Sequence, residues 1–139
     1  MSFKEKSAVI TLAALLLGGG WYFAHIVPLM RLSVEAAPVH AVRFGAMVIG
    51  MSAIAIVGHI AVAAYRPAEA RAAADERERD FELRASRLGF VTLIAGALVA
   101  SSSALWGVGG LGVANAVFAA IVAAEVVHYG AFLLLHRVG

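Results

Sequence analysis

The chain has 139 residues, of which 62% are hydrophobic and only 14% are charged, and it contains no cysteine. Soluble domains average about 45–50% apolar and about 25% charged residues, so this composition excludes an ordinary water-soluble domain. Without cysteine the chain has no disulfides, thiolate zinc sites or iron–sulfur clusters, and a formal net charge of +2 gives no support for a nucleic-acid partner.

Four apolar stretches follow one another along the chain, each close to or above the roughly 18–20 residues that cross a bilayer as a helix. We therefore predict an all-α fold: a polytopic membrane protein with a single domain over residues 1–139, built as a bundle of four transmembrane helices. Lys4 and Lys6 resemble the start of a signal peptide, but no small-residue cleavage site follows, so the first span is expected to be uncleaved. The predicted spans cover residues 7–27, 44–65, 88–106 and 113–135.

The connection over residues 66–87 is rich in Ala, Glu and Arg, which predicts a charged helix that continues into the third span. Asp75 and Glu78 have the spacing of a capping box, and Asp80 and Arg84 have the acid-first i,i+4 spacing of a helical ion pair. Between the third and fourth spans, the residues GVGGLG predict a tight turn, because glycine permits positive φ angles.

The Lys and Arg residues are distributed unevenly between the two sides of such a bundle. If the N-terminus is inside, nine of them lie on the inner side, and only Arg31 and Arg43 lie outside. Cytoplasmic segments of membrane proteins carry the excess of Lys and Arg. We therefore expect an inner (cytoplasmic) membrane protein with both termini and the 66–87 connection in the cytoplasm. The nine are Lys4, Lys6, Arg66, Arg71, Arg77, Arg79, Arg84, Arg87 and Arg137.

The opening SFKEKSA and the segment DERERDFELRASRLGF resemble a group of uncharacterised small bacterial membrane proteins. The resemblance covers the N-terminus and the start of the third predicted span. It implies a four-helix inner-membrane protein, and it carries no known activity and no catalytic residue.

Glu125 is the one carboxylate deep inside a predicted span, close to the middle of the fourth. A charged side chain there costs about 2.5–3.5 kcal/mol on insertion scales, and desolvation favours the neutral acid. His128 follows at i+3 on the same helical face. If the second and fourth spans pack together, His59 and Ser52 of the second span would join them. We therefore expect a neutral Glu125 that faces the bundle interior, within hydrogen-bond or one-water reach of His128 or His59.

Three interpretations of this polar cluster compete. Its members are hydrogen-bonded structural contacts between helices, or a protonatable site that handles protons or cations, or ligands of a metal or haem. In the last case His59 and His128 would ligate haem, or bind zinc together with Glu125. The sequence EVVH fits a di-iron motif, but such a site needs two motifs and further Glu residues.

Three polar residues, His25, His40 and Glu35, are expected at the outer interface. They would suit a small metal site, but interfacial histidines are more often solvated, and we expect that state here.

No catalytic motif is present, so we expect no enzyme. Small residues recur at i,i+4 in the spans, at Ala46 and Gly50 and at Ala116, Ala120 and Ala124. They predict close helix packing within the chain, or else a homodimer face. The partners expected are therefore the lipid bilayer and either a second copy or a larger membrane protein.

Overall fold

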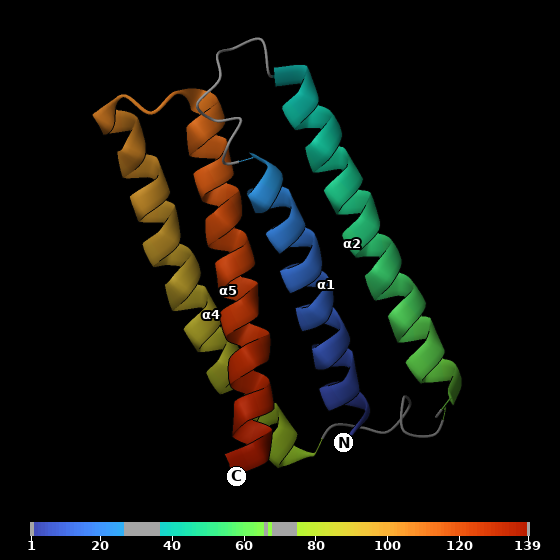
Figure 1. Cartoon of the computed structure of the whole chain (residues 1–139). Helices are drawn as coiled ribbons and strands as arrows, with labels where there is room; N and C mark the ends of the chain where they lie inside the picture. Colours follow the sequence, from blue (N-terminus) through green and yellow to red (C-terminus); the bar gives the residue numbers. More distant parts are fainter. Residues whose placement is uncertain (1, 27–36, 66, 68–74, 139) are drawn as a thin grey trace.

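A computed structural model of the chain describes residues 2–26, 37–65, 67 and 75–138. Four long helices account for most of these residues, and a short 3₁₀ helix, η3, follows the third of them (Figure 1). The predicted all-α class is confirmed, and all four long helices are long and apolar enough to cross a membrane. The elements are α1 (Phe3–Ile26), α2 (Ala37–Tyr65), α4 (Glu76–Ser103), η3 (Ala104–Trp106) and α5 (Gly110–Val138).

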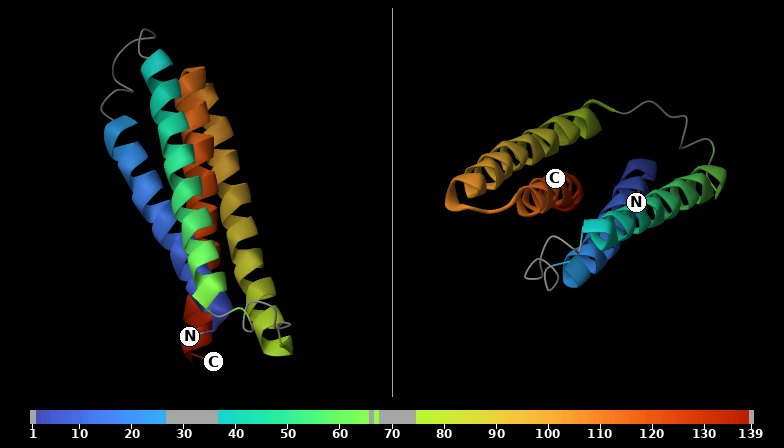
Figure 2. Two further views of the ribbon diagram at one scale, coloured as in Figure 1. Left: turned by 90° about the vertical axis from the view of Figure 1, so that its right-hand side faces the viewer. Right: turned by 90° about the horizontal axis from the view of Figure 1, so that it is seen from above.

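The helices alternate in direction, so that the N- and C-termini lie at the same end of the bundle (Figure 1). They form two antiparallel pairs, α1 with α2 and α4 with α5, and the pairs are joined where α1 packs against α5. Figure 2 shows the same arrangement from the side and from above. As a result α1 and α5 are the central helices, and α2 and α4 lie toward the edges.

From Glu76 onward, the charged segment before the third predicted span is helical and continuous with that span, as the sequence predicted. Residues 66 and 68–74 of the predicted helix lie outside the described residues. Helix α4 begins at Glu76 with Asp75 as its N-cap, and the Glu78 backbone N–H donates to Asp75 Oδ1 at 2.9 Å. This hydrogen bond holds the pKa of the exposed Asp75 carboxyl below its usual value. The ion pair predicted between Asp80 and Arg84 is present, with 2.8 Å between Asp80 Oδ2 and Arg84 Nη2.

The predicted tight turn between the third and fourth spans is confirmed at Gly107. Its φ of 81° lies in the left-handed region that favours glycine, and its N–H donates to the Ala104 carbonyl at 3.1 Å. Helix α5 begins at Gly110, three residues before the predicted span. Helix α2 begins at Ala37, seven residues early, and includes Pro38, since proline is tolerated in the first turn of a helix.

Small residues bring α4 and α5 close together. A Cβ added at Gly96 would lie 2.6 Å from Ala120 Cβ, and one added at Gly89 would lie 3.0 Å from His128 Cβ. Ala120 and Ala124 are both buried in α5. This part of the predicted small-residue rows therefore packs within the chain. The row at Ala46 and Gly50 differs, because both residues are exposed on α2.

Candidate functional site

His128 lies between two carboxylates in the half of the bundle that carries the termini. Its Nε2 is 3.1 Å from Glu82 Oε1 on α4, and its Nδ1 is 4.0 Å from Glu125 Oε2 on α5. The first distance is that of a hydrogen bond, and the second can be bridged by one water or a small side-chain rotation. We call His128, Glu82 and Glu125 the carboxylate–histidine cluster.

The local sequence explains why these three side chains meet. Glu125 and His128 are three residues apart on α5 and therefore share a face of that helix. On α4, Glu82, Ala85 and Gly89 share a face because they are spaced i, i+3 and i+7. Ala85 is fully buried, and the missing side chain at Gly89 lets the α5 backbone approach at His128. Glu82 lies one turn before Ala85 on the same face of α4, and from there its carboxylate reaches the His128 imidazole.

The cluster lies at the boundary of the apolar region rather than at its centre. Glu82 is six residues after the first residue of α4, which corresponds to about 9 Å along the axis. The side chains of Glu82 and Glu125 are each 46% exposed, whereas that of His128 is 19% exposed. The interior position expected for Glu125 is therefore met only in part: its carboxylate turns toward His128, but half of its side chain lies on the bundle surface.

A small pocket of about 310 Å³ adjoins the cluster, between α1, α4 and α5. Glu82 and Tyr129 line it together with Lys4 from α1. The Tyr129 ring stacks on the His128 ring, with 4.8 Å between centroids and 15° between planes. Lys4 Nζ lies 3.8 Å from Glu78 Oε2, so this cation is already shared with another carboxylate of α4.

The chemistry available to the cluster follows from its hydrogen-bonding groups. Ionised carboxylates only accept hydrogen bonds, and a ring that donates from both nitrogens is an imidazolium. If Glu125 holds a proton instead, its O–H can donate to Nδ1 of a neutral ring, while Nε2–H still donates to Glu82. A single proton can therefore lie on His128 or on Glu125, and the cluster carries one net negative charge in either arrangement.

His59 and Ser52 do not join this cluster. Helix α2 packs chiefly on α1, where a Cβ at Gly58 would lie 2.6 Å from Ile10 Cγ2. The His59 Nδ1–H donates to the Ala55 carbonyl of its own helix at 2.6 Å, and Ser52 is exposed. From the sequence, His59 and Ser52 were expected to join the cluster only if the second and fourth spans pack together. In the half of the bundle that carries the termini, α1 lies between α2 and α5 (Figure 1).

The same arrangement bears on the metal and haem interpretations. The described residues contain no group of three or more His, Cys, Asp or Glu side chains placed to hold a metal ion. His59 lies on α2 and His128 on α5, which belong to different antiparallel pairs, and the ring contacts of each are made within its own pair.

At the other end of the bundle, the histidines expected to be solvated behave differently from one another. His25 is exposed, and its Nδ1–H donates to the Trp21 carbonyl at 2.7 Å. His40 is only 3% exposed, so its expected solvation is wrong: its ring is packed at the start of α2. Glu35 lies outside the described residues.

Glu82 is the member of the cluster that sequence reasoning missed. It stands in the charged segment before the third span, where a carboxylate is ordinarily solvated. The sequence signal that could have identified Glu82 is its spacing from Ala85 and Gly89. These small residues lie on the face of α4 that packs against α5, and Glu82 lies on the same face one turn before Ala85.

Comparison with known proteins adds no family. The chain matches no protein-family model, no curated protein and no solved structure. The arrangement of the chain's own residues is therefore the basis on which a function can be inferred.

Proposed function

We propose that this chain is an integral protein of the cytoplasmic membrane, with both termini in the cytoplasm, that binds a proton or small cation at the carboxylate–histidine cluster. One observation carries the proposal: a single imidazole from α5 lies between two carboxylates, one on each of two helices. The nine-to-two distribution of Lys and Arg supports the orientation. In that orientation the cluster exchanges with the cytoplasm.

Charge favours a binding role over a purely structural one. A structural contact between helices needs one donor and one acceptor, and such bonds contribute about 0.6 kcal/mol on average in membrane proteins. Here two carboxylates share one imidazole, so when both carboxylates are ionised at least one negative charge has no counter-charge at the edge of an apolar region. Ionised groups at the boundary of an apolar region are stabilised by a counter-charge or by protonation, and histidine is the side chain that ordinarily changes charge between about pH 5 and 8.

Proton uptake by the purified protein in nanodiscs tests this function. The protein is titrated from pH 8 to pH 5, and the protons bound per chain are counted with an indicator dye. Glu125→Gln and Glu82→Gln preserve shape and hydrogen bonding but each remove one carboxylate beside the His128 ring, so both should lower the uptake. The matched control is Glu76→Gln, an exposed residue in the first turn of the same helix α4.

The outcomes separate the interpretations. Uptake that falls in both cluster variants, but not in the control, supports the binding site. Equal uptake in the wild type and both cluster variants, all folded, leaves the cluster with a structural role only. The same proteins in dye-loaded liposomes then show whether binding is coupled to transport, because transport requires a pH-dependent flux that Glu125→Gln abolishes.

A second candidate function is that of an accessory subunit of a larger membrane assembly. It is favoured by the exposed small residues Ala46 and Gly50 on α2, an edge helix that packs chiefly on α1. Small residues at this spacing let another helix approach closely. Affinity purification distinguishes the candidates: an accessory subunit retains a stoichiometric partner that Gly50→Leu releases, whereas a self-sufficient proton or cation site works without one.

A further inference from the structure

One side of the α4–α5 pair is hollowed in the half of the bundle that carries the termini. This hollow has a volume of about 500 Å³, and its described wall consists of residues of these two helices. It shares no described lining residue with the pocket beside the carboxylate–histidine cluster, so it is a separate feature. The residues that line it are Arg84, Arg87, Leu88, Ala131, Leu134 and Leu135.

A second hollow of about 620 Å³ continues along the same side of the pair. On α4, Leu88 of the first hollow is followed by Val91 and Ala95 of the second, at the i, i+3 and i+7 spacing of one helical face. On α5, Ala123 of the second hollow lies about three turns before Leu134 of the first, on the same face. We call the two hollows together the α4–α5 groove.

The deeper part of this groove suits hydrocarbon. Its described lining carries no charge. The one hydroxyl in that lining belongs to Thr92, and it already donates to the Leu88 carbonyl of its own helix at 2.9 Å. A polar ligand would lose its hydration there without gaining a strong hydrogen bond, whereas an acyl chain has no such cost.

The end of the groove nearest the termini differs, because two arginines stand beside it. Its described wall is apolar and both arginines are exposed, so their hydrocarbon stems line the groove while their guanidinium groups extend beyond it. Arg84 Nη2 is 2.8 Å from Asp80 Oδ2, whereas the guanidinium of Arg87 forms no ion pair with a described residue. Asp80, Arg84 and Arg87 therefore carry one net positive charge at the mouth of the groove.

The position of Arg87 along α4 corresponds to the level of lipid head groups. No charged residue follows it as far as Trp106, a helical length of about 28 Å, and the hydrocarbon core of a bilayer is roughly 30 Å thick. If the bundle crosses a membrane as proposed, Arg87 lies where hydrocarbon meets head groups, and Arg84 lies one turn further out. A guanidinium at that level can form paired, charge-assisted hydrogen bonds with a phosphate.

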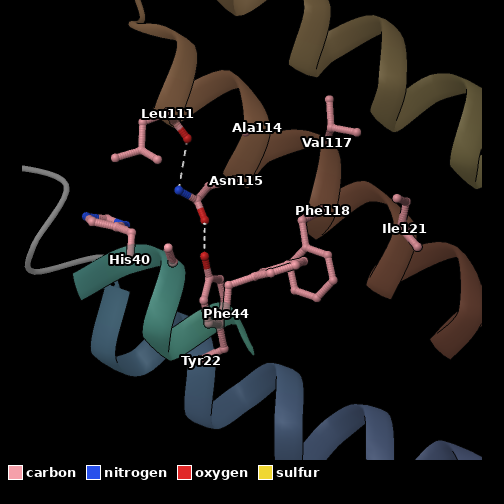
Figure 3. A pocket seen from close by; sticks show the side chains of 10 residues that line it. Tyr22, His40, Phe44, Leu111, Ala114, Asn115, Val117, Phe118 and Ile121 are labelled. Carbon is pink, nitrogen blue, oxygen red and sulfur yellow. Dashed lines mark hydrogen bonds between the residues drawn. The ribbon is translucent and has the colours of Figure 1, made fainter. Parts of the chain in front are cut away.

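The pocket at the opposite end of the bundle, between α1, α2 and α5, has no comparable charged group. Its volume is about 530 Å³, and its described lining contains no Asp, Glu, Lys or Arg, although His40 of α2 contributes to it. Figure 3 shows Tyr22 and Asn115 pointing toward one another. The Tyr22 O–H donates to Asn115 Oδ1 at 2.6 Å, and Asn115 Nδ2 donates to the Leu111 carbonyl at 2.9 Å. These polar groups are bonded within the chain, so they do not select a head group.

We propose that the α4–α5 groove binds one anionic phospholipid from the leaflet at the end that carries the termini. The lipid phosphate accepts hydrogen bonds from Arg87 and Arg84, and one acyl chain lies along the groove past Leu88 toward Ala123. The net positive charge at the mouth favours an anionic head group over a zwitterionic one. This inference rests on the membrane insertion proposed above and is independent of proton or cation binding at the carboxylate–histidine cluster.

Native mass spectrometry of the detergent-solubilised protein tests the proposal with two lipids of equal chain length, dioleoylphosphatidylglycerol and dioleoylphosphatidylethanolamine. The wild type is expected to bind one phosphatidylglycerol per chain, saturably and about tenfold more tightly than phosphatidylethanolamine, a difference of roughly 1.4 kcal/mol. Arg87→Gln should abolish this preference, and Arg84→Gln should reduce it. The matched control is Arg79→Gln, the same change of charge at an exposed residue of α4 that does not line the groove.

A variant of the apolar wall distinguishes a lipid site from a site for phosphate alone. Ala123 is exposed, so Ala123→Phe fills the groove without disturbing a buried contact. It should weaken binding of dioleoylphosphatidylglycerol but not of dihexanoylphosphatidylglycerol, whose chains are too short to reach that position.

Three results would overturn the proposal: equal binding of the two dioleoyl lipids, unchanged binding in folded Arg84→Gln and Arg87→Gln, or an equal loss of binding in Arg79→Gln. It is also overturned if the protein is a dimer that Ala123→Phe dissociates, because a second copy of the chain then fills the groove. The readout is bound lipid at constant pH, so a negative result contradicts this proposal without bearing on proton uptake.

Discussion

At the scale of single residues, the five histidines divide into two groups. His25, His59 and His136 each use Nδ1–H to donate to the carbonyl four residues earlier in their own helix, at 2.7, 2.6 and 3.1 Å. That bond pairs one ring nitrogen within the residue's own helix and gives no indication of a function for it. His128 instead directs both nitrogens toward carboxylates, and His40 has neither nitrogen paired in the described structure. The two histidines without the local bond are His128 of the carboxylate–histidine cluster and His40 at the opposite end of the bundle.

The hydrogen bond between Tyr22 and Asn115 gives a prediction of stability. Tyr22→Phe removes the hydroxyl and leaves Asn115 Oδ1 without its buried donor. The free energy of unfolding in micelles should fall by about 0.6 kcal/mol, the average of such bonds in membrane proteins, and by at most about 1.7 kcal/mol. Reversible unfolding in mixed micelles measures it. Tyr65→Phe is the control, because Tyr65 is 86% exposed, and equal effects of the two substitutions would show that the buried bond contributes nothing.

Asp75 gives a prediction of pH dependence. Its pKa is lowered because the Glu78 N–H donates to the carboxylate, so the folded value lies below the unfolded one. The cap therefore stabilises α4 fully above the unfolded value of about 3.9 and is lost as pH falls through the lower folded value. The Glu78 amide resonance should titrate in that acidic range. In Asp75→Ala, unlike Asp80→Ala, the first turn should fray already at neutral pH. A Glu78 amide that is insensitive to both changes would contradict the cap.

At the scale of helices, the interface of α4 with α5 depends on the absence of side chains. Gly96→Ala would place a Cβ 2.6 Å from Ala120 Cβ, with no flexible side chain able to move aside. We expect this substitution to lower the free energy of unfolding by about 1–3 kcal/mol, as overpacking does. Gly130→Ala is the control in α5, because a Cβ there meets no described atom within 4 Å. It should be neutral or stabilising by up to about 1 kcal/mol, since alanine is the better helix former. Equal destabilisation by both would refute the interface argument.

The helices could be predicted from the sequence, but the helix against which each of them packs could not. Bilayer thickness sets the length of an apolar helix, and turn chemistry placed Gly107, so the elements followed from local pattern. The order of the helices within the bundle could not be predicted, because a helix that is apolar on all sides has no pattern to show which of its faces packs against which other helix. The sequence therefore could not show that α2, which carries His59, packs against α1 rather than against α5. Glu82 was not singled out from the sequence, because a carboxylate in a charged segment is ordinarily solvated, although the small residues Ala85 and Gly89 lie on the helix face that carries it.

At the scale of the whole molecule, the two ends of the bundle differ in chemistry. The end with the termini carries the carboxylate–histidine cluster and the charged first turns of α4. The opposite end carries the pocket of Tyr22, His40 and Asn115, whose described lining has no charge. If the bundle crosses a membrane in the proposed orientation, proton or cation binding faces the cytoplasm and the pocket lies in the outer leaflet. The side of the membrane that each feature faces therefore follows from a single orientation.

Single-cysteine labelling tests that orientation, and the chain suits it because it contains no cysteine of its own. Val108→Cys lies in the turn between η3 and α5, where Val108 is 40% exposed, and Glu76→Cys lies at the opposite end of α4. In intact spheroplasts, a membrane-impermeant maleimide should label position 108, while position 76 should react only after permeabilisation, because the Lys- and Arg-rich side is retained in the cytoplasm. Labelling of both after lysis is the control for thiol accessibility. The reverse labelling pattern would show that the protein has the opposite orientation in the membrane. The carboxylate–histidine cluster would then exchange with the outside, and the pocket would lie in the cytoplasmic leaflet.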